Sequence, residues 1–159
     1  DYLSSIDMVV NMSINDKNKV KRIAQLVNKT NQFNLTTKRY SESEIIGFME
    51  NHSVFGFELF DKFGDFGLVA VVIIVNNDID SFLVSCRALG RRLEYKVLYL
   101  ITKYMKNNLK ASYTKTEKNS QVSNFYDKFS TSIDHDNDTV HYRLNRDSVI
   151  NVDYIKERK

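Results

Sequence analysis

Three arginines surround a glycine at the point where a bulky apolar stretch gives way to a helical pattern. Arg87 precedes Gly90, and Arg91 and Arg92 follow it. The apolar residues before them favour a strand, and the apolar spacing of three and four that continues to Tyr104 predicts a helix. Because the first turn of a helix has unpaired N–H groups and a positive dipole end, we expect this turn to bind a phosphate or pyrophosphate. The alternative is a solvated basic turn.

Three residues in or near this unit could transfer an acyl group or a proton. Cys86 lies at a strand end beside Arg87, where positive charge favours a thiolate, so it is a candidate nucleophile; alternatively it is a small buried apolar residue. Glu58 on a predicted strand and Glu94 at the helix start are candidate general bases, or else surface or helix-capping carboxylates. The histidines fit neither a triad nor a metal spacing, so we predict no metal site.

Length and composition indicate one globular domain with a proper core. The chain has 159 residues, of which 42% are hydrophobic and 27% charged. A net charge of +3 gives no reason to expect nucleic acid as a partner, and no apolar run reaches the roughly 20 residues that span a membrane. The single cysteine excludes an internal disulfide, so we expect a cytoplasmic protein. The start at Asp1, without Met or a signal peptide, suggests a piece of a longer chain.

The predicted elements occur in the order of an α/β (α+β) domain with one mixed sheet. Ser41 and Glu44 form a capping box. The strand that ends near Cys86 and the strand from Leu109 should be parallel, because a helix joins them as a right-handed crossover. Hydrophobic periodicity predicts helices at 19–31, 41–49, 93–104 and from 120, and strands at 54–61, 66–75, 79–85, 109–113 and 139–144.

Two motifs resemble those of GNAT acyltransferases. Residues 87–92 are similar to the pyrophosphate loop [RQ]-x-x-G-x-[GA], with Arg92 in place of the small residue, and residues 119–126 resemble N-x-x-[AV]-x-x-[FL]-Y. The Leu-Gly-Phe that usually follows is Phe-Ser-Thr here, at 129–131. The resemblance implies a GNAT-like fold whose two central strands splay to admit an acyl donor, with CoA or phosphopantetheine as cofactor. The cofactor-binding residues that it implies are Val84, Ser85, Arg87, Leu89, Gly90, Arg91, Arg92 and Asn119.

The same resemblance gives Tyr126 the role of the acid that protonates the departing thiolate. The alternative is that Tyr126 packs beside its aromatic neighbours. Glu58 and Cys86 complete the set of candidate catalytic residues.

A more specific resemblance covers most of the chain. Five blocks are similar to the C-terminal region of FkbH-like proteins and occur in family order, at residues 22–26, 30–37, 39–40, 61–65 and 85–91. The resemblance implies a preceding HAD-type domain, whose D-x-D-x-T motif this sequence lacks, and an acyl carrier protein as partners. It further implies that the chain serves polyketide extender-unit supply, in which a glyceryl group is loaded onto the carrier protein on the route to methoxymalonyl-carrier protein.

The resemblance divides the chain into two parts. Residues 1–15 would be a residual tail or strand of the HAD-type domain, or an edge strand, and residues 16–159 would be the GNAT-like domain. One alternative is a catalytically silent GNAT-like module that scaffolds the HAD domain. Another is a self-standing N-acetyltransferase that acts on small molecules.

Amides, hydroxyls and an arginine gather between the first two predicted helices. In GNAT folds this segment borders the acceptor side of the cleft, so we expect Asn31, Gln32, Asn34 and Arg39 to bind substrate opposite Tyr126. Amides and an arginine fork suit a polar, often anionic, glyceryl or phosphorylated three-carbon group. The alternative is that these side chains fix helix ends and brace the loop.

Overall fold

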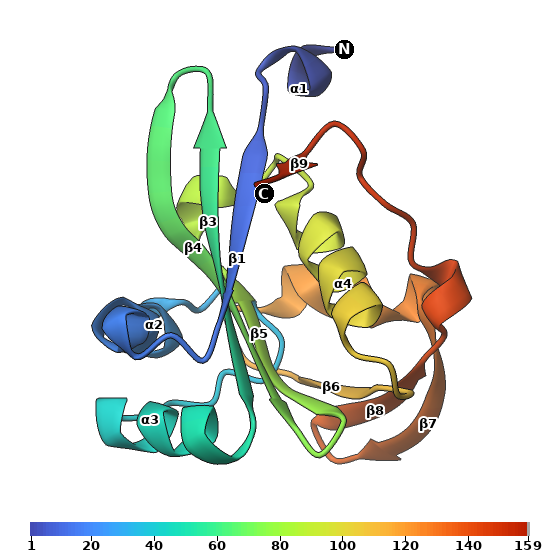
Figure 1. Ribbon diagram of the computed structural model, residues 1–159. Coiled ribbons are helices and arrows are strands. Elements are labelled where there is room, and N and C mark those ends of the chain that lie inside the picture. Colours follow the sequence, from blue (N-terminus) through green and yellow to red (C-terminus); the bar gives the residue numbers. More distant parts are fainter. Residues whose placement is uncertain (159) are drawn as a thin grey trace.

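The computed structural model describes residues 1–158, and one mixed sheet separates two layers of helices (Figure 1). The hydrogen-bonded order is β7-β8-β6-β5-β4-β3-β1-β9, and β2 pairs with β5 outside this path. Only the β1–β9 and β5–β6 pairs are parallel among the described strands. The strands are β1 (Val9–Ile14), β2 (Phe33–Asn34), β3 (Ser53–Asp61), β4 (Gly64–Val75), β5 (Asp78–Val84), β6 (Lys110–Thr114), β7 (Ser130–Asp136), β8 (Thr139–Leu144) and β9 (Lys156–Glu157).

The helices lie on both faces of the sheet, with α2 and α3 on one face and α4 on the other (Figure 1). The expected α/β class with a mixed, mostly antiparallel sheet is confirmed. In residues 1–158 no helix has the length and apolar character needed to cross a bilayer. The helices are α1 (Tyr2–Ser5), α2 (Val20–Lys29), α3 (Glu42–Asn51) and α4 (Leu93–Tyr104), with 3-10 turns η1 (Lys17–Lys19), η2 (Cys86–Ala88), η3 (Ser120–Val122), η4 (Phe125–Lys128) and η5 (Arg146–Ser148).

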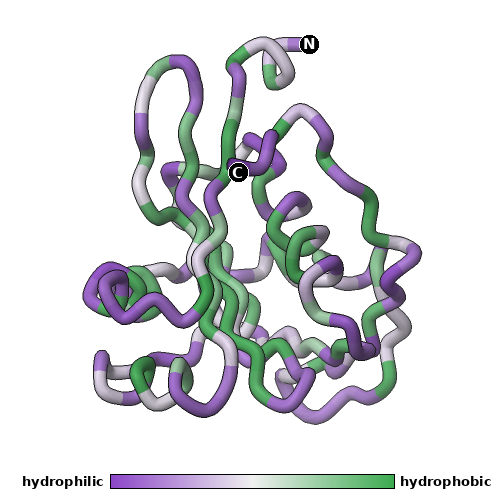
Figure 2. Tube along the Cα trace, viewed as in Figure 1, coloured by the Kyte–Doolittle hydropathy of each residue, from purple (hydrophilic) through white to green (hydrophobic). Residues whose placement is uncertain are grey.

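Strand β4 holds the two halves of the core together. Its side chains alternate between the faces, so Val72 packs in the cluster under α4 whereas Val71 packs in the cluster under α2 and α3. Figure 2 shows hydrophobic residues along the sheet and hydrophilic residues on the outer sides of α2 and α3. Fully burying each such side chain contributes about 1.5–3 kcal/mol. The predicted capping box is also confirmed, because Ser41 accepts from the Glu44 N–H and Glu44 accepts from the Ser41 N–H.

The N-terminal segment is part of this sheet, so residues 1–15 are not a free tail and contain the expected strand, which lies next to the edge because β9 pairs only with Val9 and Val10. Val9–Ile14 pairs with β3 over its full length, and β9 continues the sheet on its other side. The backbone N–H of Lys156 donates to Met8 O and that of Arg158 to Val10 O. Strands β1 and β9 therefore lie side by side at one edge of the sheet, so any boundary with a preceding domain would lie before β1.

The helix expected from Ser120 is absent, and the two 3-10 turns η3 and η4 stand in its place. Their bonds connect residues three apart, as from Val122 N–H to Asn119 O and from Asp127 N–H to Asn124 O. Serine and asparagine compete with helical bonding through their own side chains, which explains why the apolar spacing here did not produce an α-helix.

Candidate functional site

The basic turn between β5 and α4 presents a row of backbone N–H groups. Gly90 has φ +87° and Arg92, the residue before the helix, has φ 64°, so the chain turns sharply here. Glycine suits position 90 because an L side chain is strained at such a φ. Within the described residues, none of the four N–H groups from Gly90 to Leu93 donates a hydrogen bond of normal geometry to the protein. The turn is therefore suited to an anion.

A cavity of about 210 Å³ opens beside this turn, and we call it the α4 cavity. Its lining combines three amide side chains, a carboxyl, an ammonium and three aromatic rings, so it offers both donors and acceptors over an apolar floor. The lining residues are Gln32, Phe33, Leu89, Gly90, Glu94, Tyr95, Gln121, Val122, Asn124, Phe125 and Lys128.

Charged groups meet around one ring at this cavity. The Arg92 guanidinium lies 4.7 Å and the Lys128 ammonium 5.7 Å from the centre of the Tyr95 ring. Glu94 lies beside them, and its Oε1 is buried without a hydrogen-bond partner in residues 1–158. Burial raises the pKa of Glu94, although its own backbone N–H and the charge of Arg92 oppose this. The rim is thus cationic and the wall holds one unsatisfied acceptor.

The other arginines of the turn point elsewhere. Arg91 donates to Arg87 O at 3.0 Å, lies 3.9 Å from an Asp61 carboxylate oxygen and stacks on the Phe66 ring at 4.5 Å. Its side chain therefore joins the turn to the β3–β4 hairpin, so among its groups only the backbone N–H remains available for a phosphate. Arg87 is exposed to solvent and does not line the cavity.

Strands β5 and β6 do separate, but β2 fills the gap between them. The two strands pair only at Asp78–Lys110 and Ile79–Ala111. Beyond that point Phe33 pairs with Val84, and Leu35, the residue after β2, is bonded to both strands, because its N–H donates to Phe82 O and its carbonyl accepts from Thr114 N–H. Ser85 N–H points to the other side of β5, where it donates to Val69 O of β4. The edge of β5 at Val84 is thus closed by β2 to the pantetheine chain that the sequence placed there.

Aromatic packing fixes β2 in this gap. Phe33 is 4% exposed, and its ring centre lies 5.6 Å from that of Phe82 and 5.3 Å from that of Phe125. Leu35 is fully buried. Because two large side chains are buried here, moving this segment out of the gap and both side chains into water would cost about 3–6 kcal/mol.

Most of the expected substrate-binding residues brace the chain instead. Arg39 donates to Val27 O at 2.5 Å and to Thr30 O at 3.0 Å, and also to the Asn31 side chain. The buried Asn34 amide bonds the loop backbone, donating to Thr30 O at 3.2 Å. Gln32 alone of the four lines the α4 cavity. The expectation that all four point into the cleft is therefore wrong, because unpaired carbonyls at the end of α2 attract the arginine.

The Asn119 side chain holds neighbouring backbone segments together and is not available as a cofactor ligand. It is fully buried, and its Nδ2 donates to Asn34 O and Thr114 O, each at 2.9 Å. Its Oδ1 accepts from Thr116 N–H at 2.8 Å and from the Tyr113 hydroxyl at 3.0 Å. All its hydrogen-bonding capacity is thereby used to connect β2 with β6, so none is left for a ligand.

Tyr126 lies inside the core. It is 1% exposed, its ring packs on Phe125 and Tyr142, and its hydroxyl has no hydrogen-bond partner in the described residues. Burial, with smaller contributions from Asp78 and Tyr142, raises the pKa of Tyr126 well above its ordinary value. A phenol that neither meets the α4 cavity nor ionises readily is poorly placed as the expected acid, whereas packing beside Phe125 matches the alternative.

Neither Cys86 nor Glu58 lines the α4 cavity. Cys86 is exposed, which makes the buried-apolar alternative wrong, and its Sγ lies 3.4 Å from Gln32 Oε1. Glu58 accepts from Asn11 and Lys19, each at 2.9 Å, on the β1 side of the sheet. Burial would raise the pKa of Glu58, but these bonds and nearby positive charges outweigh it and lower the pKa, so Glu58 is a paired carboxylate and a weak base. Residues 1–158 contain no cluster of ligands for a metal ion.

Comparisons with known proteins identify the fold. No protein-family model and no curated protein sequence matches this chain. Among solved structures, an IAA acetyltransferase from Bacillus cereus aligns with TM-score 0.56 and 11% identity, covering 85% of this chain and 98% of its own. The PaiA N-acetyltransferase from Thermoplasma acidophilum, solved in complex with coenzyme A, aligns with TM-score 0.57 and 10% identity, covering 84% and 98%. The fold is that of the GNAT acetyltransferases.

A further GNAT structure, apo FdhC, described as a nucleotide-linked sugar GNAT, aligns with TM-score 0.56 and 12% identity and covers 89% of both chains. The GNAT fold expected from the sequence is thus confirmed at the level of architecture. Within this fold, the chain's own β2 fills the gap between the two splayed strands, whereas the turn before α4 stays open.

Several residues of the α4 cavity were not predicted from the sequence. Gln121 lies in η3, Lys128 in η4 and Asn124 just before η4, where the sequence predicted one continuous helix. A helical interpretation of 120–129 directs attention to the apolar face and assigns these polar residues to solvent. The presence of two helix-breaking residues, Ser123 and Asn124, was the available signal for a bent segment whose polar side chains could meet the turn.

The burial of Tyr126 predicts that its hydroxyl is dispensable. Changing Tyr126→Phe should leave the fold intact and raise the free energy of unfolding by about 1 kcal/mol, because it removes a buried hydroxyl without a partner. The matched change Tyr113→Phe should lower it by about 1 kcal/mol, because that hydroxyl bonds Asn119. Urea unfolding measures both. A clear loss of stability in Tyr126→Phe would mean that the hydroxyl has a partner.

Proposed function

We propose that this GNAT-fold chain binds the phosphate end of CoA, or of the phosphopantetheine on an acyl carrier protein, in the α4 cavity. The observation that carries the proposal is the row of unpaired N–H groups from Gly90 to Leu93 at the start of a 12-residue helix. An anion there gains several backbone hydrogen bonds and the helix dipole. Arg92 and Lys128 add positive charge at the rim.

The biological setting that we propose is that of an FkbH-like enzyme in polyketide extender-unit supply. In it, this chain would receive the carrier protein's arm while a preceding HAD-type domain provides the activated glyceryl group. The similar blocks support this setting because they meet in space: 30–37 supplies β2, which pairs with β5 just before block 85–91, and Asp61 of block 61–65 faces Arg91. Blocks that are distant in sequence thus form one unit around the turn.

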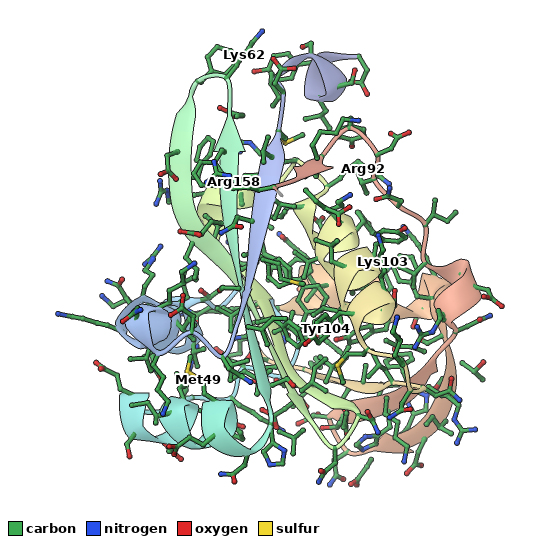
Figure 3. All side chains as sticks on the ribbon, viewed as in Figure 1. Met49, Lys62, Arg92, Lys103, Tyr104 and Arg158 are labelled. Carbon is green, nitrogen blue, oxygen red and sulfur yellow. The ribbon has the colours of Figure 1, made fainter. Side chains whose placement is uncertain are left out.

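Charge reversal at the rim tests the binding proposal. We expect CoA to bind the unmodified chain in isothermal titration calorimetry and Arg92→Glu to weaken binding about tenfold or more, because a carboxylate would then face the phosphate. Lys103→Glu is the matched control, since it changes the net charge equally but lies in the last turn of α4 (Figure 3 labels both residues). No binding of CoA or holo-carrier protein, or equal loss in both variants, would refute the proposal.

A second candidate function is a catalytically silent module that positions the HAD domain. The specific observation in its favour is that β2 closes the strand edge where a pantetheine chain would lie. Glyceryl transfer by the full FkbH-like enzyme proposed above should then persist in the double variant Tyr126→Phe, Cys86→Ala. Loss of transfer by a folded double variant would count against the silent module, whereas persistence without CoA binding would favour it.

A further inference from the structure

The carboxyl group of Glu94 occupies an unusual place in the α4 cavity. It lines the cavity one residue after the last of the unpaired N–H groups, that of Leu93, and its Oε1 is buried without a donor among the described residues. A buried acceptor without a partner costs about 1–3 kcal/mol, and more if it is charged. The cavity thus contains an acceptor that only a ligand or a water molecule can satisfy.

The neighbouring groups do not satisfy Glu94. Arg92, from its own turn, and Lys128, from η4, both lie against the Tyr95 ring. Tyr95 on α4 is the remaining titratable residue of the lining, and its other polar residues are uncharged amides: Gln32 just before β2, Gln121 in η3 and Asn124 just before η4. None of these side chains donates to Glu94.

Strand β2 determines what a ligand can bond beyond its phosphate. A pantetheine chain carries a hydroxyl and amide N–H groups, and these donors need acceptors when they leave water. The edge of β5 cannot supply them, because Phe33 and Leu35 already occupy it. A phosphate on the N–H groups of the turn would place the next atoms of the ligand in the α4 cavity, which the carboxyl group of Glu94 lines.

We propose that Glu94 accepts a hydrogen bond from the hydroxyl or an amide N–H of the ligand's pantetheine chain, and that the α4 cavity thereby selects phosphopantetheine over a bare inorganic phosphate or pyrophosphate. This proposal rests on the proposed function. A site with a buried acceptor penalises ligands that leave it unpaired, which is a stronger source of selectivity than added apolar contact. Lys128 and Arg92 contribute to both ligand types, so they do not discriminate.

The test compares two ligands on three proteins by calorimetry. For Glu94→Leu, which keeps the bulk but removes the acceptor, we expect the affinity for 4′-phosphopantetheine to fall about tenfold or more while that for inorganic pyrophosphate stays the same or rises. For Glu94→Gln, whose amide oxygen still accepts, most of the phosphopantetheine affinity should remain. Thermal unfolding of each variant shows whether it is folded. If Glu94→Leu does not fold, the affinities of Glu94→Gln and the unmodified chain are compared instead.

The outcomes separate the two proposals. If neither ligand binds the unmodified chain, the proposed function fails. If both bind and Glu94→Leu weakens both equally or neither, the function stands and the selective role of Glu94 is refuted. Loss of phosphopantetheine affinity in Glu94→Gln equal to that in Glu94→Leu would also refute it, because the acceptor oxygen would then not matter.

Discussion

Replacing Phe33 by alanine should lower the free energy of unfolding by about 4 kcal/mol. The side chain is 4% exposed and packs against the rings of Phe82 and Phe125, so its removal leaves a cavity where β2 meets β5. Chemical denaturation measures the change. The matched control is Phe63→Ala in the β3–β4 turn, where the ring is 70% exposed and the loss should stay below about 1 kcal/mol.

The Phe33 result decides whether β2 is a permanent element. A loss as small as that of Phe63→Ala would mean that β2 leaves the gap easily, and the edge of Val84 would then be open to a pantetheine chain. A large loss means that the gap stays closed under native conditions, so a ligand is confined to the α4 cavity.

Replacing Asn119 by alanine should lower the free energy of unfolding by about 3 kcal/mol, because four hydrogen bonds are lost. Buried backbone groups of β2 and β6 are then left unpaired. Asn124→Ala removes an exposed amide that lines the α4 cavity and should change stability by less than about 0.5 kcal/mol.

The same pair of variants separates a structural role from a binding role. Calorimetric titration with CoA at a temperature where both variants are folded should give a larger change in affinity for Asn124→Ala than for Asn119→Ala. Unchanged stability with lost CoA binding in Asn119→Ala would restore the cofactor role that the sequence motif predicted.

Local patterns predicted the elements that local chemistry determines. The capping box places the start of α3, and the unbroken apolar run identifies β4 as a central strand, because each depends on neighbours in sequence. Gly90 likewise identifies the turn before α4, since its positive φ is a local requirement. Together with the order of elements, these features predicted the α/β class with one mixed sheet, whereas the GNAT fold was implied by the motif resemblance.

Non-local contacts determined what the sequence could not predict. Strand β2 has two residues and exists only because it pairs with β5, about fifty residues later, so no periodicity marks it. The direction of Arg91 follows from Asp61 on a distant hairpin, and the burial of Tyr126 follows from the strands beneath it. Motif spacing thus located candidate residues but did not determine which way their side chains point.

The most direct test of the account is a titration of the ¹⁵N-labelled chain with 4′-phosphopantetheine, followed by NMR. We predict chemical-shift changes at the amides of Gly90 to Leu93, while the amide of Leu35, which donates to Phe82 O at 3.1 Å, keeps its protection from hydrogen exchange. Unchanged chemical shifts at the amides of Gly90 to Leu93 would contradict the claim that the ligand binds at the turn. Loss of hydrogen-exchange protection at Leu35 when the ligand binds would contradict the claim that β2 stays in place.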